Sequence, residues 1–315
     1  MQNRFSKPLR LGTRGSPLAL TQTQMVLAKL CAHYPELCET GATEVVVIKA
    51  SGDHILGSQD KRLVDVGGKG LFTKELEEAL LHNSIDIAIH SMKDVPTWLP
   101  SSLDIAATLP REDPRDALIS RGVDSFDTLP QGAVVGTSSL RRQAQILSMR
   151  PDLKVIPLRG NVETRIAKLE AGQVDATLLA YAGLKRLGLE GRANAILETT
   201  ILLPAVAQGI IGLEIRISDD GLRANLNAIN CNATFTSMLA ERAMLEVLDG
   251  SCHTPIAGLA IHGDEGLYLK GLVAHPEGKG IWRAEQTAHI SDAITLGREV
   301  GRKLRSTIPS GILPE

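Results

Sequence analysis

Residues 85–96 read IDIAIHSMKDVP, and the rest of the chain is organised around this stretch. Isoleucines at 85, 87 and 89 alternate with smaller or polar residues, which is the pattern of a buried or half-buried β-strand. Polar residues then follow, and Pro96 prevents a regular strand from continuing. A strand that ends in this way places Ser91, Lys93 and Asp94 at the carboxyl edge of a sheet, where open α/β folds bind ligands. The same pattern also fits an exposed loop with an ordinary surface aspartate.

A second occurrence of the pattern predicts two similar α/β domains. Residues 174–180, VDATLLA, follow a helix and a small polar turn, as residues 85–89 do, and again carry aspartate second and alanine soon after. We therefore expect two related domains with a cleft between them, and a chain that returns to the first domain after Leu203. From about Cys231 the pattern changes to a helix, three strands and a last helix, which predicts a small α+β domain. The expected domains are residues 1–109 plus 210–228, residues 110–209, and residues 229–315.

The composition argues against nucleic-acid and membrane partners. The 315 residues carry a net charge of -2, and aromatic residues make up only 3% of the chain. Residues 1–11 lack the apolar core of a signal peptide, and the apolar run 201–215 is interrupted and too short to span a bilayer. We therefore expect a cytoplasmic protein. Four cysteines are too few for a disulfide framework, and no cysteine or histidine spacing predicts a metal site.

Arginines gather at the predicted strand ends and helix starts. Guanidinium groups bind carboxylates in a bidentate manner, and each charge-assisted bond contributes roughly 1.5–3 kcal/mol. Several arginines facing one cleft would repel each other unless a polyanion bound there. The alternative is that they are scattered on solvated faces. The residues concerned are Arg14, Arg141, Arg142, Arg159, Arg165 and Arg186.

Two strand-to-helix junctions have the form of anion sites. Residues 12–17, GTRGSP, combine Ser16 as an N-cap with proline at the first helical position. Free backbone N–H groups at such a helix start can bind an anion. Residues 136–142, GTSSLRR, repeat the arrangement. The glycines at 67–70 lack the spacing of a phosphate-binding loop and predict a mobile lid instead.

Cys252 stands apart from the other cysteines, because it lies beside His253 in a polar break after a helix. A cysteine–histidine pair can form a thiolate nucleophile. Neighbours in sequence rarely form the nucleophile–base pair, so the spacing alone leaves this role open.

Eight motifs, in the same order along the chain, resemble the porphobilinogen deaminase family, also called hydroxymethylbilane synthase. They are residues 12–20, 67–72, 90–96, 111–117, 136–142, 158–162, 182–187 and 204–209. The resemblance implies a transferase of tetrapyrrole and haem biosynthesis. Members of the family join four porphobilinogen molecules, losing ammonia at each step, onto a covalent dipyrromethane primer, and then release the linear tetrapyrrole by hydrolysis. It also implies two doubly wound domains like those of type II periplasmic binding proteins, followed by a small α+β domain.

The resemblance assigns roles to individual residues. By motif position Cys252 carries the dipyrromethane cofactor through a thioether, Asp94 is the catalytic acid, and Lys69 belongs to a flexible loop over the cleft. The arginines named above match those that bind the acetate and propionate groups of cofactor and substrate. Smaller polar contacts match Ser16, Ser91, Lys93, Thr137 and Ser139.

Asp65 stands where some members have lysine, and Ile215 where cysteine is frequent, so neither is placed in the site. Two other classes of function fit the residues. One is a carboxylate-binding sensor or transport module with the same cleft, against which the missing signal peptide and the third domain argue. The other is an unrelated thiol-dependent transferase that uses Cys252 and His253. We expect a monomer that acts on the small molecule porphobilinogen.

Overall fold

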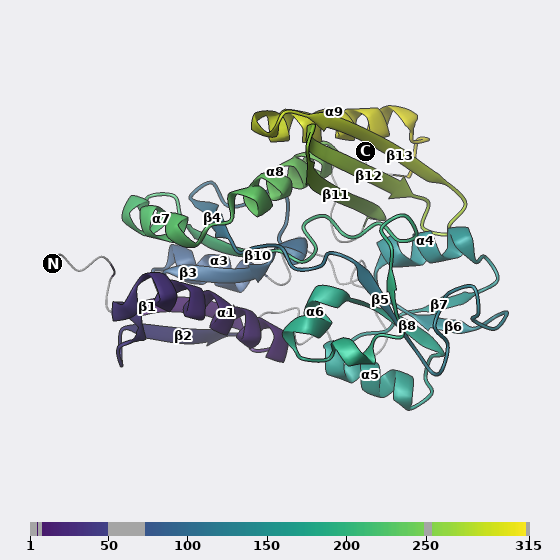
Figure 1. The fold of residues 1–315 in the computed structure, drawn as a ribbon, viewed down its shortest axis with the longest axis horizontal. Helices are drawn as coiled ribbons and strands as arrows, with labels where there is room; N and C mark the ends of the chain where they lie inside the picture. The colour runs from purple at the N-terminus through teal and green to yellow at the C-terminus, as the bar shows by residue number, and fades with distance from the viewer. Residues whose placement is uncertain (1–4, 6–7, 50–72, 249–253, 313–315) are drawn as a thin grey trace. The chain divides into compact units, whose positions relative to one another are not determined.

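The computed structural model describes residues 5, 8–49, 73–248 and 254–312. The chain divides into two compact units. Unit 1 comprises Met1–Ile55, Gly70–Arg111 and Ile210–Phe235, and unit 2 comprises Leu56–Lys69, Glu112–Gly209 and Thr236–Glu315. Figure 1 shows the elements of both units.

Unit 1 is built on a five-stranded sheet in the order β2-β1-β3-β10-β4. β1 pairs in parallel with β2 and β3, whereas β10 runs antiparallel to β3 and β4. The strands are β1 (Leu9–Arg14), β2 (Thr43–Ile48), β3 (Ile87–Ser91), β4 (Leu103–Thr108) and β10 (Ile211–Arg216).

Helices cover both faces of this sheet, because both faces of its strands are apolar. α1 (Pro17–His33) and α7 (Asp220–Leu226) pack on the face that carries Leu11 and Ile89. α3 (Lys74–Leu81) packs on the opposite face, which carries Ala88. Burial on both sides gives the continuous apolar runs expected of a central strand.

Unit 2 contains a second five-stranded sheet in the order β7-β6-β8-β5-β9. β6 pairs in parallel with β7 and β8, and β5 runs antiparallel to β8 and β9. The strands are β5 (Asp116–Ser120), β6 (Val134–Gly136), β7 (Lys154–Ile156), β8 (Ala176–Ala180) and β9 (Ala195–Leu197). α4 (Leu140–Met149) covers one face, and α5 (Val162–Glu170) and α6 (Tyr181–Arg186) cover the other.

The two sheets repeat one plan, as the paired sequence patterns predict. In unit 1, β3 lies between its parallel neighbour β1 and the antiparallel β10, and in unit 2, β8 lies between its parallel neighbour β6 and the antiparallel β5. The aspartates of the two patterns also make equivalent hydrogen bonds. Asp86 accepts from the backbone N–H of Arg10 at 2.9 Å, and Asp175 accepts from the backbone N–H of Val134 at 2.8 Å. Asp86 therefore joins the start of β3 to that of β1, and Asp175 joins the start of β8 to that of β6.

Unit 2 also contains a three-stranded antiparallel sheet in the order β11-β12-β13. One face of this sheet packs on Ala144 of α4, and the other face packs on α8 and α9. Figure 1 shows α9 lying along the sheet. α9 approaches α8 closely at Gly297, where an added Cβ would lie 2.2 Å from the carbonyl oxygen of Ala240. The elements are α8 (Asn232–Val247), β11 (Ile256–Gly263), β12 (Gly266–Ala274), β13 (Ile281–Ala288) and α9 (Ala293–Thr307). Short 3-10 turns complete the described chain at η1 (Pro35–Cys38), η3 (Met92–Asp94), η4 (Glu190–Arg192), η5 (Asn227–Ile229) and η6 (Ile290–Asp292).

The predicted fold class is confirmed: two similar α/β sheets with helices on both faces, followed by a small α+β sheet. Each sheet falls within one predicted domain, although the domain boundaries themselves stay a prediction. Asp116, near the end of the charged run 111–117, begins the buried strand β5. Residues 92–94, which follow β3, form a 3-10 turn. Among the described residues, no helix is long and apolar enough to cross a membrane.

Candidate active site

In unit 1 the predicted site residues lie at the carboxyl edge of the sheet. β1 and β3 are parallel neighbours, so Arg14 at the end of β1 and Ser91 at the end of β3 share one edge. Lys93 and Asp94 follow in the turn η3. Their side chains are partly exposed. This arrangement keeps the Asp94 carboxylate accessible while its backbone is held by the sheet.

The turn that carries Asp94 is anchored on β10. The backbone N–H of Met92 donates to the carbonyl oxygen of Ile210 at 3.0 Å, and the N–H of Val95 donates to Met92 at 3.2 Å. The Met92 side chain lies over Gly212, where an added Cβ would be 2.1 Å from the sulfur. Close backbone approach thus holds the turn against the neighbouring strand.

Two hydroxyls predicted for the site have internal partners. The Ser91 hydroxyl exchanges hydrogen bonds with the buried Gln22 side chain of α1, at 2.8 and 3.1 Å. Ser16 is the N-cap of α1, as predicted, and its hydroxyl accepts from the N–H of Ala19 at 3.3 Å. Gln22 was not predicted, because a polar residue within a helix carries no local signal of what it contacts.

In unit 2 a second carboxyl edge collects the other predicted residues. β6, β7 and β8 are parallel, and their ends lead to Thr137 and Ser139, to Arg159, and to Arg186 in α6. Ser139 is the N-cap of α4, and its hydroxyl accepts from the N–H of Arg142 at 3.4 Å. Because these strands run parallel, the residues that follow them lie at one edge of the sheet.

Arg141 and Arg142 share one buried carboxylate. Asp116 is 0% exposed and accepts from Nη2 of Arg141 at 2.7 Å, and from Nη2 and Nε of Arg142 at 2.6 and 3.2 Å. Gln208 donates to the same carboxylate at 3.1 Å. Burial of Asp116 would raise its pKa, but the two guanidinium charges outweigh it and hold the pKa below its usual range. Repulsion between these two arginines is therefore relieved by Asp116, which the sequence did not single out.

Arg159 is buried, and its guanidinium forms no ion pair within the described part of the chain. The residue is 6% exposed, and neither Nη1 nor Nη2 has a hydrogen-bond partner among the described residues. The backbone turns directly afterwards at Gly160, whose φ of 119° and close contact with Thr164 exclude a side chain. The structure therefore leaves two buried donor groups of Arg159 unsatisfied within the described part of the chain.

Arg165 and Arg186 complete the edge. Nε of Arg165 donates to the carbonyl oxygen of Gly160 at 2.9 Å, and Nη2 of Arg186 donates to that of Gly209 at 2.6 Å. Burial lowers the pKa of Arg186 to about 10, although the Glu112 charge opposes the shift. Its buried Nε has no partner in the described part of the chain.

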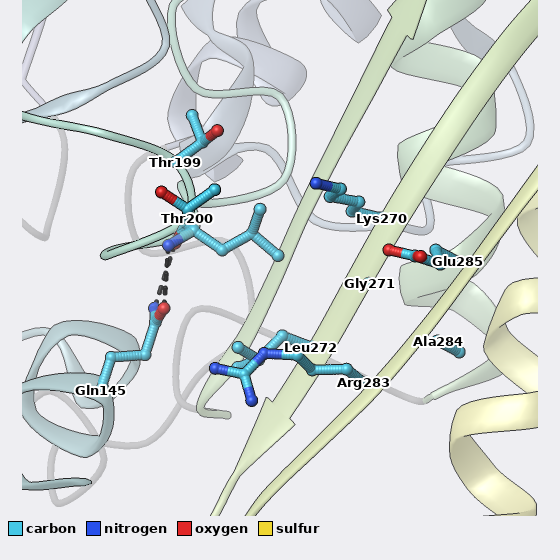
Figure 2. A pocket seen from close by; sticks show the side chains of 10 residues that line it. Gln145, Thr199, Thr200, Lys270, Gly271, Leu272, Arg283, Ala284 and Glu285 are labelled. Carbon is cyan, nitrogen blue, oxygen red and sulfur yellow. Dashed lines mark hydrogen bonds between the residues drawn. The ribbon is translucent and has the colours of Figure 1, made fainter. Parts of the chain in front are cut away.

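Several predicted features lie outside the described residues. They are Lys69, the expected lid at 67–70, Asp65 and Cys252. A cavity of about 190 Å³ in unit 2, shown in Figure 2, is lined by the basic side chains of Lys270 and Arg283 and by Thr199 and Thr200. Among the predicted site residues that the structure describes, none lines this cavity.

Solved structures with a related architecture include binding proteins. The methionine binding protein MetQ is 13% identical, covers 73% of this chain and 90% of its own, and gives a TM-score of 0.43. The periplasmic aliphatic sulphonate binding protein SsuA from Escherichia coli is 16% identical, covers 77% of this chain and 70% of its own, and gives 0.40. The fold class follows from the strand orders of the sheets.

The sequence comparisons are far stronger. The family model described as "Porphobilinogen deaminase, dipyromethane cofactor binding domain" matches residues 9–224, and "Porphobilinogen deaminase, C-terminal domain" matches residues 235–306. Porphobilinogen deaminase of Nitrobacter hamburgensis is 52% identical over 299 residues, covering 94% of this chain and 92% of that protein. Chloroplastic porphobilinogen deaminase of Oryza sativa is 48% identical over 306 residues, covering 96% and 85%. The chain therefore belongs to the porphobilinogen deaminase family.

Proposed function

We propose that this protein works as a hydroxymethylbilane synthase through Asp94, Cys252 and a set of carboxylate-binding arginines. Membership of the family makes it a transferase of tetrapyrrole biosynthesis. The observation that carries the assignment of binding residues is the buried guanidinium of Arg159, which has no partner among the described residues.

A buried arginine without a counter-charge is costly. The penalty for burying an ion in a protein is several kcal/mol, and it is offset only by an opposite charge with good hydrogen-bond geometry. A carboxylate bound to both Nη atoms would supply that charge and two parallel hydrogen bonds. We therefore assign Arg159 to a carboxylate of the ligand.

The dipyrromethane cofactor fits this requirement, because its pyrroles carry acetate and propionate groups. When bound, it supplies the primer onto which substrate units are joined. Arg159, Arg165 and Arg186 would bind its carboxylates or those of the substrate. Thr137 and Ser139 would add hydroxyl contacts at the same edge of the sheet.

Arg141 and Arg142 contribute in a different way. Their N–H groups already donate to Asp116 and to the carbonyl oxygens of Leu203 and Leu178. Two guanidinium charges against one carboxylate leave this buried cluster with a net charge of +1. We propose that this fixed positive potential attracts the ligand's carboxylates, since electrostatic effects are strong where water is excluded.

Asp94 is the proposed proton-transfer group. Asp94 is partly exposed on an anchored turn, so its carboxylate can stabilise positive charge on a pyrrole nitrogen and can accept or donate a proton. Arg14, Ser91 and Lys93 lie at the same edge and would contact ligand in unit 1. Lys69 would contact ligand from the predicted lid.

The first test measures cofactor content by intact mass of the denatured protein. The wild type should carry an extra mass equal to two linked pyrrole units, and Cys252→Ala should lose it. An unmodified wild type, expressed with substrate available, would contradict the anchor. Binding of porphobilinogen without turnover would instead support a carboxylate-binding module.

The second test compares Arg159→Leu with Arg159→Lys and with Arg192→Leu as control. Arg192 is exposed, pairs with Glu170 and is not among the predicted site residues. Arg159→Leu should lose cofactor content and turnover, while its folding stability matches or exceeds that of the cofactor-free wild type, because an uncompensated charge is removed. Arg159→Lys should retain only part of the wild-type cofactor content and turnover, since lysine cannot bind a carboxylate in a bidentate manner. Equal behaviour of Arg159→Leu and Arg192→Leu would exclude Arg159 from the site.

We also propose that the protein acts as a cytoplasmic monomer on a small-molecule substrate, without nucleic acid. The net charge of -2 and the low aromatic content support the absence of a nucleic-acid partner. Size-exclusion chromatography with light scattering tests the monomer, and a dimer mass would overturn it.

A further inference from the structure

Unit 1 buries an ionisable pair directly behind the turn that carries Asp94. Nε2 of His90, in β3, lies 2.9 Å from Oε2 of Glu214, in β10, and the two side chains are 3% and 0% exposed. The antiparallel register pairs His90 with Gly212 and Glu214 with Ala88, so both side chains stand on one face of the sheet in diagonal positions. The pair is therefore a side-chain link between two central strands.

The surroundings of the pair contain a second buried carboxyl group. Glu77 of α3 is buried on the same unit, and α3 packs on the sheet face that carries Ala88. Burial raises the pKa of Glu77, and the charge of Glu214 raises it further. Glu77 is therefore electrostatically coupled to Glu214.

Stability alone gives little reason for such a pair. Replacing a buried ion pair with apolar residues of similar volume is often neutral or stabilising, whereas removing one partner alone is strongly destabilising. Oε1 of Glu214 also has no hydrogen-bond partner among the described residues, which adds to the cost. What such a pair does provide is one defined arrangement of the strands that it joins.

The strands that it joins are those that hold the Asp94 turn. β10 contacts this segment at Ile210, through the N–H of Met92, and at Gly212, under the Met92 side chain. Glu214 adds a third contact, at His90. The pairing of β10 with β4 is irregular between Leu213 and Glu214, and such irregularities redirect side chains.

We propose that His90 and Glu214 are positioning residues for Asp94: their buried contact sets the end of β3, and with it the placement of the carboxylate four residues later. This inference rests on the proposed role of Asp94. A misplacement of about 1 Å can lower a rate by about 10²-fold, so a small shift of the turn would be measurable.

The test uses the cofactor-loaded enzyme and separates positioning from stability. His90→Leu should lower both the melting temperature and kcat, because it leaves Glu214 buried and unpaired. The double variant His90→Leu/Glu214→Leu removes both partners, so most of the melting temperature should return. Its kcat should stay at least about tenfold below wild type, within the range for misplaced groups, with KM little changed. Recovery of kcat together with the melting temperature would overturn the proposal, because the pair would then be only structural.

Asp104→Asn serves as the matched control. Asp104 lies in β4, the other neighbour of β10, and pairs with Arg223 at 3.1 Å on a partly exposed surface. This variant should keep wild-type kcat. A fall equal to that of the double variant would show that any lost ion pair in the unit has the same effect, against the proposal.

A cycle with Asp94→Asn separates this inference from the proposed function. If His90 acts through Asp94, then His90→Leu should lower turnover in the wild type but add nothing in the Asp94→Asn background. Equal effects in both backgrounds would overturn the positioning role. Wild-type turnover in Asp94→Asn itself would instead refute the proposed role of Asp94.

Discussion

Replacing Asp116 with asparagine should destabilise the protein by about 3–5 kcal/mol, the cost of breaking a buried ion pair by removing one partner. Asp116 is 0% exposed and receives four hydrogen bonds, three of them from the buried guanidinium groups of Arg141 and Arg142. Asparagine keeps the shape but leaves the two buried positive charges facing each other. Since 1 kcal/mol shifts the melting temperature of a domain of 150–250 residues by about 2–4 °C, the expected decrease is about 6–20 °C.

Thermal unfolding followed by circular dichroism measures the decrease, with Asp113→Asn as control. Asp113 also pairs with an arginine, and its two oxygens lie 2.8–3.1 Å from the guanidinium of Arg115. Its side chain is 20% exposed, however, and that of Arg115 is 31% exposed. Exposed pairs contribute about 1 kcal/mol or less, so the control should melt within a few degrees of wild type. Equal decreases in the two variants would refute the reasoning from burial.

The pH dependence gives a second test of the same carboxylate. The pKa of Asp116 in the folded protein lies below its usual range, and the unfolded value is about 3.9. The folded state therefore binds fewer protons, and the stabilisation is fully present above the unfolded pKa and is lost as the pH falls towards the folded one. The difference in unfolding free energy between wild type and Asp116→Asn should shrink below about pH 4. A difference that stays constant to lower pH would show that ionisation of Asp116 is not its source.

Three further substitutions test other parts of the site. Asp94→Asn should lower turnover by at least about 10²-fold with little change in melting temperature, because the group is partly exposed; near-normal rates would remove it from the mechanism. Ser16→Ala should cost about 1 kcal/mol in urea unfolding, because the N–H of Ala19 loses its cap, and an unchanged midpoint would contradict this role. Gly212→Ala should cost about 1–3 kcal/mol, because its Cβ would displace the Met92 side chain, and unchanged stability would show that the site has free space.

Local patterns in the sequence were sufficient to predict many of the elements. The alternating isoleucines predicted β3, and the Ser16–Pro17 pair predicted the start of α1, because periodicity and capping involve residues only a few positions apart. The same holds for the C-terminal hairpins and α9. The aspartates at 86 and 175 showed the repeat, although their bonds to the neighbouring strands became visible only in the structure.

The counter-charges within the site could not be predicted in the same way. The run 111–117 is rich in charge, which hid the start of β5 at Asp116, and nothing local links that residue to arginines 25 and 26 positions later. The sequence predicted that the clustered arginines need an anion, and the structure shows that they differ in this respect. Arg141 and Arg142 pair with the carboxylate of Asp116, whereas the Nη atoms of Arg159 have no partner among the described residues. Motifs along the chain thus determined the family, the fold class and the candidate residues. Only the tertiary structure decided which charges are satisfied internally, because pairing between distant segments depends on strand order and burial, which sequence spacing does not contain.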